Sequence, residues 1–189
     1  MEIQEMLQSI TNDRYREPLL VLYGDIESTL KKMPAAVRWH HDEPGGLYRH
    51  TQEVMELALE IYKPLKSDLR KRAITENDVL LCAFIHDLEK LDKYKKNHDY
   101  DPEMKYTKGY RETAFKYNYD KIDMNDTAQV VRMCAKRGLE LKDNHLNAIT
   151  MHHGGWSLDN KGSMTPLAVI LHSADLISAN LYKEQGRGS

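Results

Sequence analysis

The chain has 189 residues, of which 30% are charged, and its formal net charge of −2 excludes both general coating of nucleic acid by bulk positive charge and a long acidic tail. Its length suits one domain with a sizeable hydrophobic core. Its two cysteines, Cys82 and Cys134, fall in apolar helical patterns and form no metal-binding or disulfide framework, and no apolar run reaches membrane-spanning length. We therefore expect a soluble, cytoplasmic protein without a signal peptide or a membrane partner.

The first half of the chain shows apolar residues at helical spacing. Residues 3–10 and 14–33 are predicted helices, and a loop rich in proline and glycine follows over residues 37–46. The next predicted helix runs from about Leu47 to Leu65, with its end at or near Pro64.

The second half continues the helical pattern. Thr75, with Asp78 three residues later in a capping-box position, starts a helix that we expect to carry the segment FIHDLEKLD, residues 84–92. Since no segment alternates convincingly between apolar and polar residues, we expect an all-α single-domain bundle without strands. The remaining predicted helices are residues 125–137 closed by Gly138, residues 143–152, and residues 167–182 after Thr165 and Pro166.

The segment FIHDLEKLD places polar chemistry at the end of an apolar run. His86 and Asp87 are adjacent, and Lys90 lies on the same side of the expected helix. Burying such polar and charged groups in an apolar environment costs free energy unless they are paired or bind a ligand. Taken alone, a hydrogen-bonded core histidine is the commoner explanation of such a pair, so the functional interpretation depends on the spacing of the chain's other histidines and acids.

Further candidate ligands lie in other predicted helices. His50 falls in the helix that begins at Leu47, the pair His152 and His153 closes a short helix, and Asp175 lies in the last one. Imidazole nitrogen and carboxylate oxygen together suit Mn²⁺, Mg²⁺, Fe²⁺, Ni²⁺ or Zn²⁺, and packed antiparallel helices can bring such side chains to one point. Four ligands leave open positions for water and a phosphate oxygen, which catalysis requires.

The pattern of His50, then His86 and Asp87, then Asp175 resembles the HD superfamily of metal-dependent phosphohydrolases, an all-helical fold. The blocks MPAAVRWHHDEPGGLYRHTQEV, FIHDLEKLD, AITMHHGGW and MTPLAVILHSADLISANL are similar, in order, to the HD domain of bacterial 3′-to-5′ exoribonucleases. The resemblance covers residues 33–182. It implies that these four residues bind the first metal between the helices and that Lys90 contacts the phosphate.

Two departures from the family pattern limit this resemblance. Glu89 stands where the family usually has glycine before the lysine, and no histidine lies clearly between the HD pair and His152, so one metal is expected and a second stays open. We also expect no additional nucleic-acid-binding domain of the kind that the exoribonucleases carry, so the resemblance supports a hydrolytic centre better than RNA as substrate. The expected division is residues 1–32 as helices packed on the domain, 33–185 as the HD domain, and 186–189 as a tail.

Several other histidines flank the expected centre. His152 is expected to bind a second metal or a phosphate, and His153 to act in catalysis with Asp87 and Lys90; a role as hydrogen-bond donors behind the ligands is equally compatible. His172 is expected to orient a ligand. The loop residues His40 and His41 either line the mouth of the site or cap a turn, whereas His98 and His145 are expected on the surface.

Residues 93–121 differ in composition from their surroundings. They hold more basic than acidic residues and six of the chain's eleven tyrosines. Interleaved tyrosine and lysine can stack a base and hold phosphates, so we expect a substrate-binding lid that includes Lys93 and Tyr94. A solvated connection without such a role is the alternative.

The sequence therefore favours metal-dependent hydrolysis of a phosphoester in a nucleotide or short oligonucleotide, as a 3′-to-5′ exonuclease-like phosphodiesterase. The expected partner is a nucleotide or a short single-stranded nucleic acid, and a homo-oligomer stays open. One alternative is a deoxynucleotide mono- or triphosphohydrolase. A degenerate HD protein that binds or senses a nucleotide without cleaving it is a second alternative, of a different class.

Overall fold

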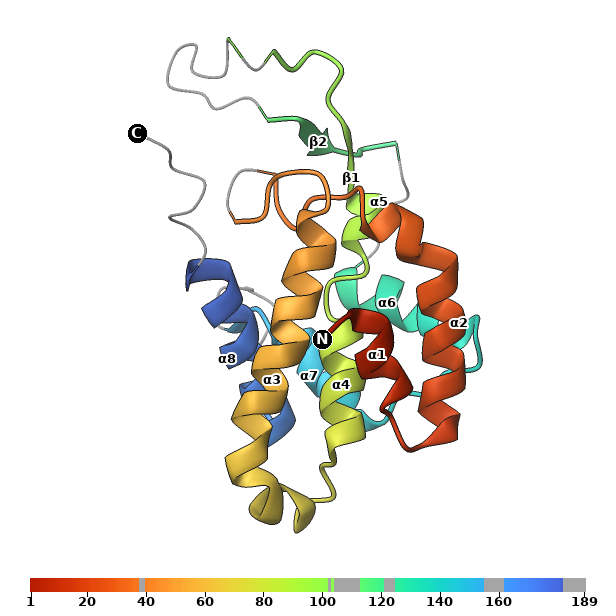
Figure 1. The fold of residues 1–189 in the computed structure, drawn as a ribbon, viewed down its shortest axis with the longest axis vertical. Coiled ribbons are helices and arrows are strands. Elements are labelled where there is room, and N and C mark those ends of the chain that lie inside the picture. The colour runs from red at the N-terminus through yellow and green to blue at the C-terminus, as the bar shows by residue number, and fades with distance from the viewer. Residues whose placement is uncertain (38–39, 102, 104–112, 121–124, 155–161, 182–189) are drawn as a thin grey trace.

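A computed structural model describes residues 1–37, 40–101, 103, 113–120, 125–154 and 162–181. Helices dominate these residues, so the all-α class expected from the sequence is confirmed (Figure 1). Among them, no helix is both long and apolar enough to span a membrane.

Two N-terminal helices, α1 (Ile3–Gln8) and α2 (Asp13–Leu30), lie against one side of the bundle (Figure 1). The Asn12 side chain accepts a hydrogen bond from the backbone of Arg14 and so caps α2, which explains why the chain restarts as a helix here. The apolar faces of both helices join the same hydrophobic core as the rest of the chain.

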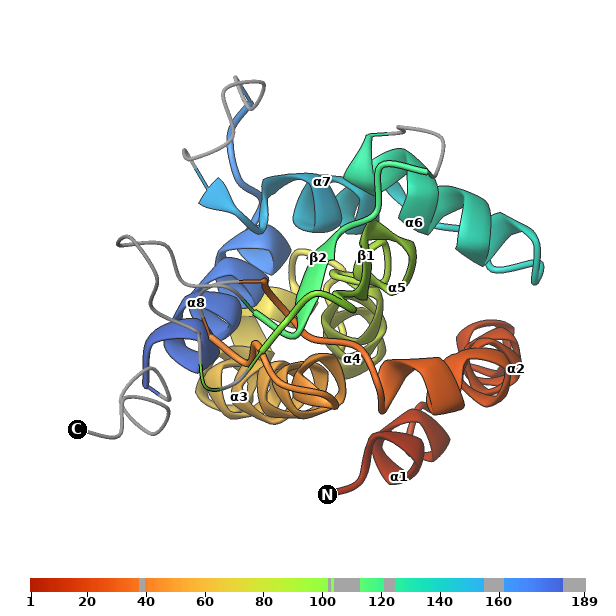
Figure 2. The ribbon, with the colours of Figure 1, turned by 90° about the horizontal axis from the view of Figure 1, so that it is seen from above.

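The centre of the molecule is α4 (Glu76–Ile85), which packs against α3 (Gly46–Arg70), α7 (Asp143–Met151) and α8 (Pro166–Leu181) (Figures 1 and 2). Every residue of α4 from position 78 to position 85 is buried, as the unbroken apolar run predicts. The predicted end of α3 at Pro64 is wrong, because the helix continues past this residue to Arg70 and buries Leu69 in the core.

The segment FIHDLEKLD does not form one helix, contrary to expectation. The helix α4 ends at Ile85, and tight turns lead into the short helix α5 (Lys90–Lys93). In these turns Leu88 and Lys90 donate backbone hydrogen bonds to residues three positions earlier, which is the spacing of a 3₁₀ turn. The tighter winding turns the side chains of Asp87 and Lys90 toward each other.

A short antiparallel hairpin follows, which the sequence analysis missed. Strands β1 (Tyr94–Lys96) and β2 (Phe115–Tyr117) pair above α5 (Figure 1). Three residues per strand are too few for alternation to stand out in the sequence.

Two helices complete the fold. The first, α6 (Asp126–Ala135), is capped by Asn125 and followed by Gly138 in a left-handed conformation; the second, α7, packs on α8. The expectation that His145 lies on the surface is wrong. Its ring on α7 is fully buried, and its Nε2 lies 2.7 Å from Oδ1 of Asp78 on α4.

Candidate metal centre

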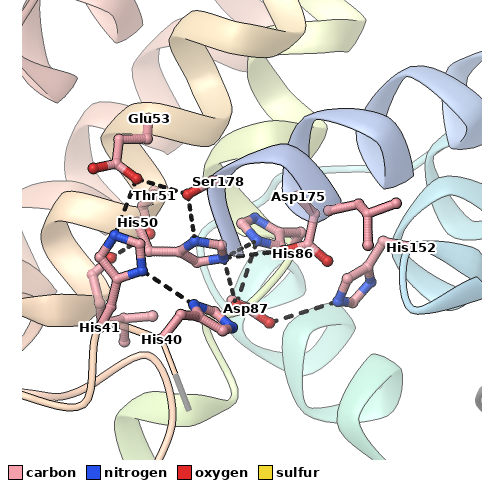
Figure 3. Close-up of polar contacts among 12 residues, drawn as sticks. His40, His41, His50, Thr51, Glu53, His86, Asp87, His152, Asp175 and Ser178 are labelled. Atoms are coloured by element: carbon pink, nitrogen blue, oxygen red, sulfur yellow. Dashed lines mark hydrogen bonds and ion pairs between the residues drawn. The ribbon is translucent and has the colours of Figure 1, made fainter. Parts of the chain in front are cut away.

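The candidate ligands meet where α3, the turn after α4, and α8 come together (Figure 3). His50 lies one turn into α3 and is completely buried. Its Nε2 lies 3.3 Å from Oδ2 of Asp87 and 3.2 Å from Oδ1 of Asp175. His86 completes the group, with its Nε2 3.3 Å from Nε2 of His50 and 3.4 Å from Oδ2 of Asp87.

These separations match those of ligands around one small cation. Donor atoms about 2.1 Å from an ion and at right angles to one another are about 3 Å apart. His50, His86 and Asp87 also form a group whose ligand atoms all lie within 4.8 Å of one another. The sequence-predicted set of two imidazoles and two carboxylates is therefore brought together with suitable spacing.

Hydrogen bonds on the far side of each ring orient the imidazoles. Nδ1 of His86 lies 2.8 Å from the carbonyl oxygen of Ala83, and Nδ1 of His152 lies 2.7 Å from that of Ile149. A carbonyl only accepts, so each Nδ1 carries a proton, and in the neutral ring each Nε2 keeps a free lone pair. These lone pairs face Asp87, which is the tautomer that a metal ligand needs.

The electrostatics favour ionised carboxylates at this point. Burial would raise the pKa of Asp87, but the charge of Lys90 and the neighbouring imidazoles outweigh it and hold that pKa well below its usual value. The pKa of Asp175 is likewise lowered against the effect of burial, chiefly by the adjacent imidazole of His50. Two ionised carboxylates, the buried Asp87 and the partly buried Asp175, together with the surrounding imidazoles form a set of donors that suits a divalent cation.

Lys90 is buried and donates a hydrogen bond to Oδ2 of Asp87. Burial lowers the pKa of its ammonium group, but the adjacent Asp87 more than compensates, so that the pKa is raised overall and Lys90 is charged. A fixed positive charge therefore lies directly beside the candidate ligands.

The other oxygen of Asp87 faces a second set of side chains. Nε2 of His152 lies 3.5 Å from Oδ1 of Asp87, and these two buried atoms have no hydrogen-bond partner among the described residues. The rings of His153 and His152 are tilted by 46° to each other with centroids 3.8 Å apart, and burial together with the neighbouring His152 lowers the pKa of His153 to about 4. Asp87, His152 and His153 form a further group that could hold a cation, so these residues fit an ion here as well.

The loop before α3 covers the centre from the side of His50. The rings of His40 and His50 lie with their centroids 4.9 Å apart, and Nδ1 of His40 is 3.1 Å from Nδ1 of His41. His41 has a φ of 51°, and a Cβ on Gly46 would lie 2.0 Å from the His41 carbonyl oxygen. Glycine is therefore required where the loop folds back onto the start of α3.

Glu89, the departure from the family pattern, points into the protein. It is 1% exposed, and neither carboxylate oxygen has a hydrogen-bond partner among the residues that the structure describes. Burial and the nearby charge of Asp87 raise the pKa of Glu89 to about 7. It therefore adds less negative charge near neutral pH than an exposed glutamate would.

The remaining predicted site residues lie at the edge of the centre. Tyr94 is buried, and burial raises the pKa of its hydroxyl group, whereas Lys93 forms an ion pair with Asp126 at 2.8 Å. His172 contacts the centre only indirectly, with its Nδ1 at hydrogen-bond distance from the backbone carbonyl of His152. Much of the expected lid, residues 102, 104–112 and 121, lies outside the described residues.

Sequence reasoning missed two polar residues behind His50. Glu53 follows His50 by three positions on α3, and Ser178 follows Asp175 by three positions on α8. Residues three apart share a helix face, so this spacing was the available signal. Figure 3 shows both side chains beside His50.

Comparison with known proteins agrees with this geometry. Over 172 residues the chain is 23% identical to the dihydroneopterin 2′,3′-cyclic phosphate phosphodiesterase of Methanocaldococcus jannaschii, an alignment that covers 91% of the chain and 60% of the relative. The chain thus spans less than two thirds of that protein. No solved structure shows a significant similarity. The model of the HD domain family matches residues 47–180, and the chain therefore belongs to the HD domain family.

Proposed function

We propose that this protein is a metal-dependent phosphodiesterase that hydrolyses a phosphoester bond in a nucleotide or a short oligonucleotide. The observation that carries the proposal is the convergence of Nε2 of His50 and Nε2 of His86 on the carboxylates of Asp87 and Asp175, at 3.2 to 3.4 Å. The relative that acts on a cyclic phosphate supports phosphodiester cleavage as the reaction class.

In this proposal His50, His86, Asp87 and Asp175 hold one divalent cation, and His152 with His153 and the second oxygen of Asp87 hold another cation or a phosphate group. When bound, a divalent cation would polarise a phosphoryl oxygen and lower the pKa of a water molecule. Imidazole with carboxylate suits Mn²⁺, Mg²⁺, Fe²⁺, Ni²⁺ and Zn²⁺ alike.

The protein's own residues then have distinct tasks. The ionised carboxylate of Asp87 orients the attacking water and accepts a hydrogen bond from it. The Lys90 ammonium group offsets the negative charge that develops on the phosphoryl oxygens. His153, uncharged at neutral pH because of its lowered pKa, donates or accepts a hydrogen bond at the leaving oxygen rather than supplying a full positive charge.

Substrate contacts are proposed for the residues around the mouth. His40 covers the centre from one side, held by its contact with His41, and the hairpin with Tyr94 lies next to Lys90 on the other. On the hairpin, the ring centroids of Tyr94 and Tyr117 are 5.4 Å apart, and Tyr117 is 47% exposed. An exposed aromatic side chain near a phosphate-binding lysine favours a substrate that carries a base.

One screen tests this proposal against its alternatives. Protein loaded separately with each of the five metals is incubated with nucleoside 2′,3′-cyclic phosphates, short single-stranded RNA and DNA, and deoxynucleoside mono- and triphosphates. Cleavage of cyclic phosphates or stepwise shortening of oligonucleotides supports a phosphodiesterase, whereas phosphate released only from mononucleotides supports the deoxynucleotide hydrolase. Binding of nucleotides without any turnover would instead support the sensing protein.

A further inference from the structure

Glu53 on α3 is a carboxylate shared by two parts of the site. Its Oε2 accepts a hydrogen bond from Oγ of Ser178 at 2.7 Å, and the same oxygen lies 3.0 Å from Nε2 of His41 (Figure 3). The Glu53 side chain is 16% exposed. One acidic group therefore joins α8 and the loop before α3 behind the metal ligand His50.

The direction of these hydrogen bonds fixes the tautomer of His50. Ser178 has a single hydroxyl hydrogen, which it donates to Glu53. Its oxygen must therefore accept the hydrogen of His50 Nδ1, which lies 2.9 Å away. In the neutral imidazole, which is the form that binds a metal, the lone pair of His50 is then left on Nε2, the atom that faces Asp87 and Asp175.

His50 needs this arrangement because of where it lies. His86 and His152 each follow the end of a helix and use the carbonyl oxygen three residues earlier. His50 lies inside α3, where the backbone carbonyls are engaged in helix hydrogen bonds and the Leu47 carbonyl also accepts from Thr51. Its acceptor has to come from another helix, and Ser178 on α8 supplies it.

We propose that Ser178 and Glu53 are positioning residues that hold His50 in its ligating tautomer, and that Glu53 also secures the loop carrying His40 through His41. This inference rests on the proposed function only in taking His50 as a metal ligand. A carboxylate that accepts a hydrogen bond from a hydroxyl group makes the oxygen of that hydroxyl a better acceptor and the ligating imidazole more basic.

Loss of the Ser178 hydroxyl and loss of the Glu53 charge should have different effects on metal binding and on substrate binding. Removing the Ser178 hydroxyl leaves Nδ1 of His50 without its acceptor but keeps the contact between Glu53 and His41. Neutralising Glu53 weakens both its hydrogen bond from Ser178 and its contact with His41. Ser178→Ala should therefore lower metal affinity, whereas Glu53→Gln should lower metal affinity and also raise KM for the substrate through the loop that carries His40.

The experiment measures the dissociation constant of Mn²⁺ by isothermal titration calorimetry in the full chain. We expect Ser178→Ala and Glu53→Gln to weaken binding by about 10- to 100-fold. Glu60→Gln is the matched control, because Glu60 is exposed on the same helix and pairs only with Lys63 among the described contacts. It should bind Mn²⁺ like the wild type. Circular dichroism verifies that each variant is folded.

A rescue variant separates positioning from general packing. In the double variant Ser178→Asp with Glu53→Gln, a carboxylate at position 178 can accept the His50 Nδ1 hydrogen directly, and we expect affinity to return to within about threefold of the wild type. Long-range ¹H–¹⁵N correlation spectra of Zn²⁺-loaded protein should show the Nδ1-protonated tautomer of His50 in the wild type and in the rescue variant.

The outcomes distinguish this inference from the proposed function. Folded Ser178→Ala and Glu53→Gln variants with wild-type Mn²⁺ affinity would overturn the positioning role while leaving the hydrolase intact. A wild-type protein that binds no divalent cation would overturn the proposed function, and the inference with it. If the double variant does not regain Mn²⁺ affinity, the single variants weaken binding by disturbing the packing and not by releasing the His50 tautomer.

Discussion

The carboxylate of Asp87 faces His50 and His86 with one oxygen and His152 with the other. Nε2 of His50 lies 3.3 Å from Oδ2, whereas Nε2 of His152 lies 3.5 Å from Oδ1. A single side chain thus borders two candidate cation positions, and removal of His152 should affect only one of them. We expect His152→Ala to slow turnover yet retain one tightly bound cation after dialysis, as measured by elemental mass spectrometry. A variant that retained no cation would show that His152 belongs to the first position.

The second prediction concerns the buried pair of Asp87 and Lys90. Asp87→Asn should lower turnover by about 10²-fold or more, because both cation positions lose a charged ligand. It should also lower the free energy of unfolding by about 3 kcal/mol, because the buried Lys90 is left without its anion. The double variant Asp87→Asn with Lys90→Met should regain most of that stability in urea unfolding without regaining activity. Parallel recovery of activity would contradict the mechanism.

Metal removal should change thermal stability in a defined way. A cation that binds only the folded protein stabilises it by about 2.7 kcal/mol at 100 times its Kd, which corresponds to about 5–10 °C in Tm for a chain of this size. Differential scanning fluorimetry with and without a chelator measures this shift. Asp175→Asn should reduce it strongly, whereas Asp68→Asn, at an exposed position on α3, should not. Equal shifts in both variants would argue against Asp175 as a ligand.

A stability prediction follows from the pair formed by His145 and Asp78. Asp78 accepts hydrogen bonds from His145 and from Thr75 at the start of α4. We expect Asp78→Ala to lower the free energy of unfolding by about 3 kcal/mol at pH 7, measured by urea denaturation, because a buried pair and a helix cap are lost together. The exposed Asp68→Ala should change it by less than about 0.5 kcal/mol.

The same pair predicts a pH dependence. Burial would raise the pKa of Asp78, but the hydrogen bonds from His145 and Thr75 outweigh burial and lower it. The ionised form is thus favoured in the folded state, so its contribution is complete above the unfolded pKa of about 4 and is lost as the pH falls toward the folded pKa. The difference in stability between the wild type and Asp78→Asn should therefore shrink below about pH 4. A difference that stayed constant would exclude this linkage.

The hairpin supplies a prediction about the substrate. If a base stacks on Tyr117, Tyr117→Ser should raise KM for a nucleoside 2′,3′-cyclic phosphate about tenfold, since stacking on one aromatic side chain contributes on the order of 1–3 kcal/mol. KM for a cyclic phosphodiester without a base, such as glycerol 1,2-cyclic phosphate, should stay the same. Equal effects on both substrates would assign Tyr117 to the packing of the hairpin against Tyr94 instead.

Local patterns in the sequence predicted most of the fold. The helical periodicity located α2, α6, α7 and α8 to within a few residues, because each of these helices buries one face. Tertiary packing decided the exceptions. Buried Leu69 keeps α3 helical beyond Pro64, and the turns after Ile85 allow Asp87 and Lys90 to pair.

The candidate site was predicted in part. The resemblance identified the four candidate ligands, and the structure brings them together. Glu53 and Ser178 were missed because they contact each other from positions 125 residues apart, and their spacing of three from His50 and Asp175 does not reveal that contact. His145 was misplaced for the same reason, since its partner Asp78 lies on another helix.

The wide separation of these residues along the chain has a consequence for how the protein matures. His50 obtains its hydrogen-bond acceptor from a residue 128 positions later, and Asp175 comes from the same late helix, α8. A polypeptide still being synthesised, or one cleaved within the connections before α8, would offer a cation only a partial and poorly oriented set of donors. Tight metal loading should therefore mark the molecules in which α8 has docked.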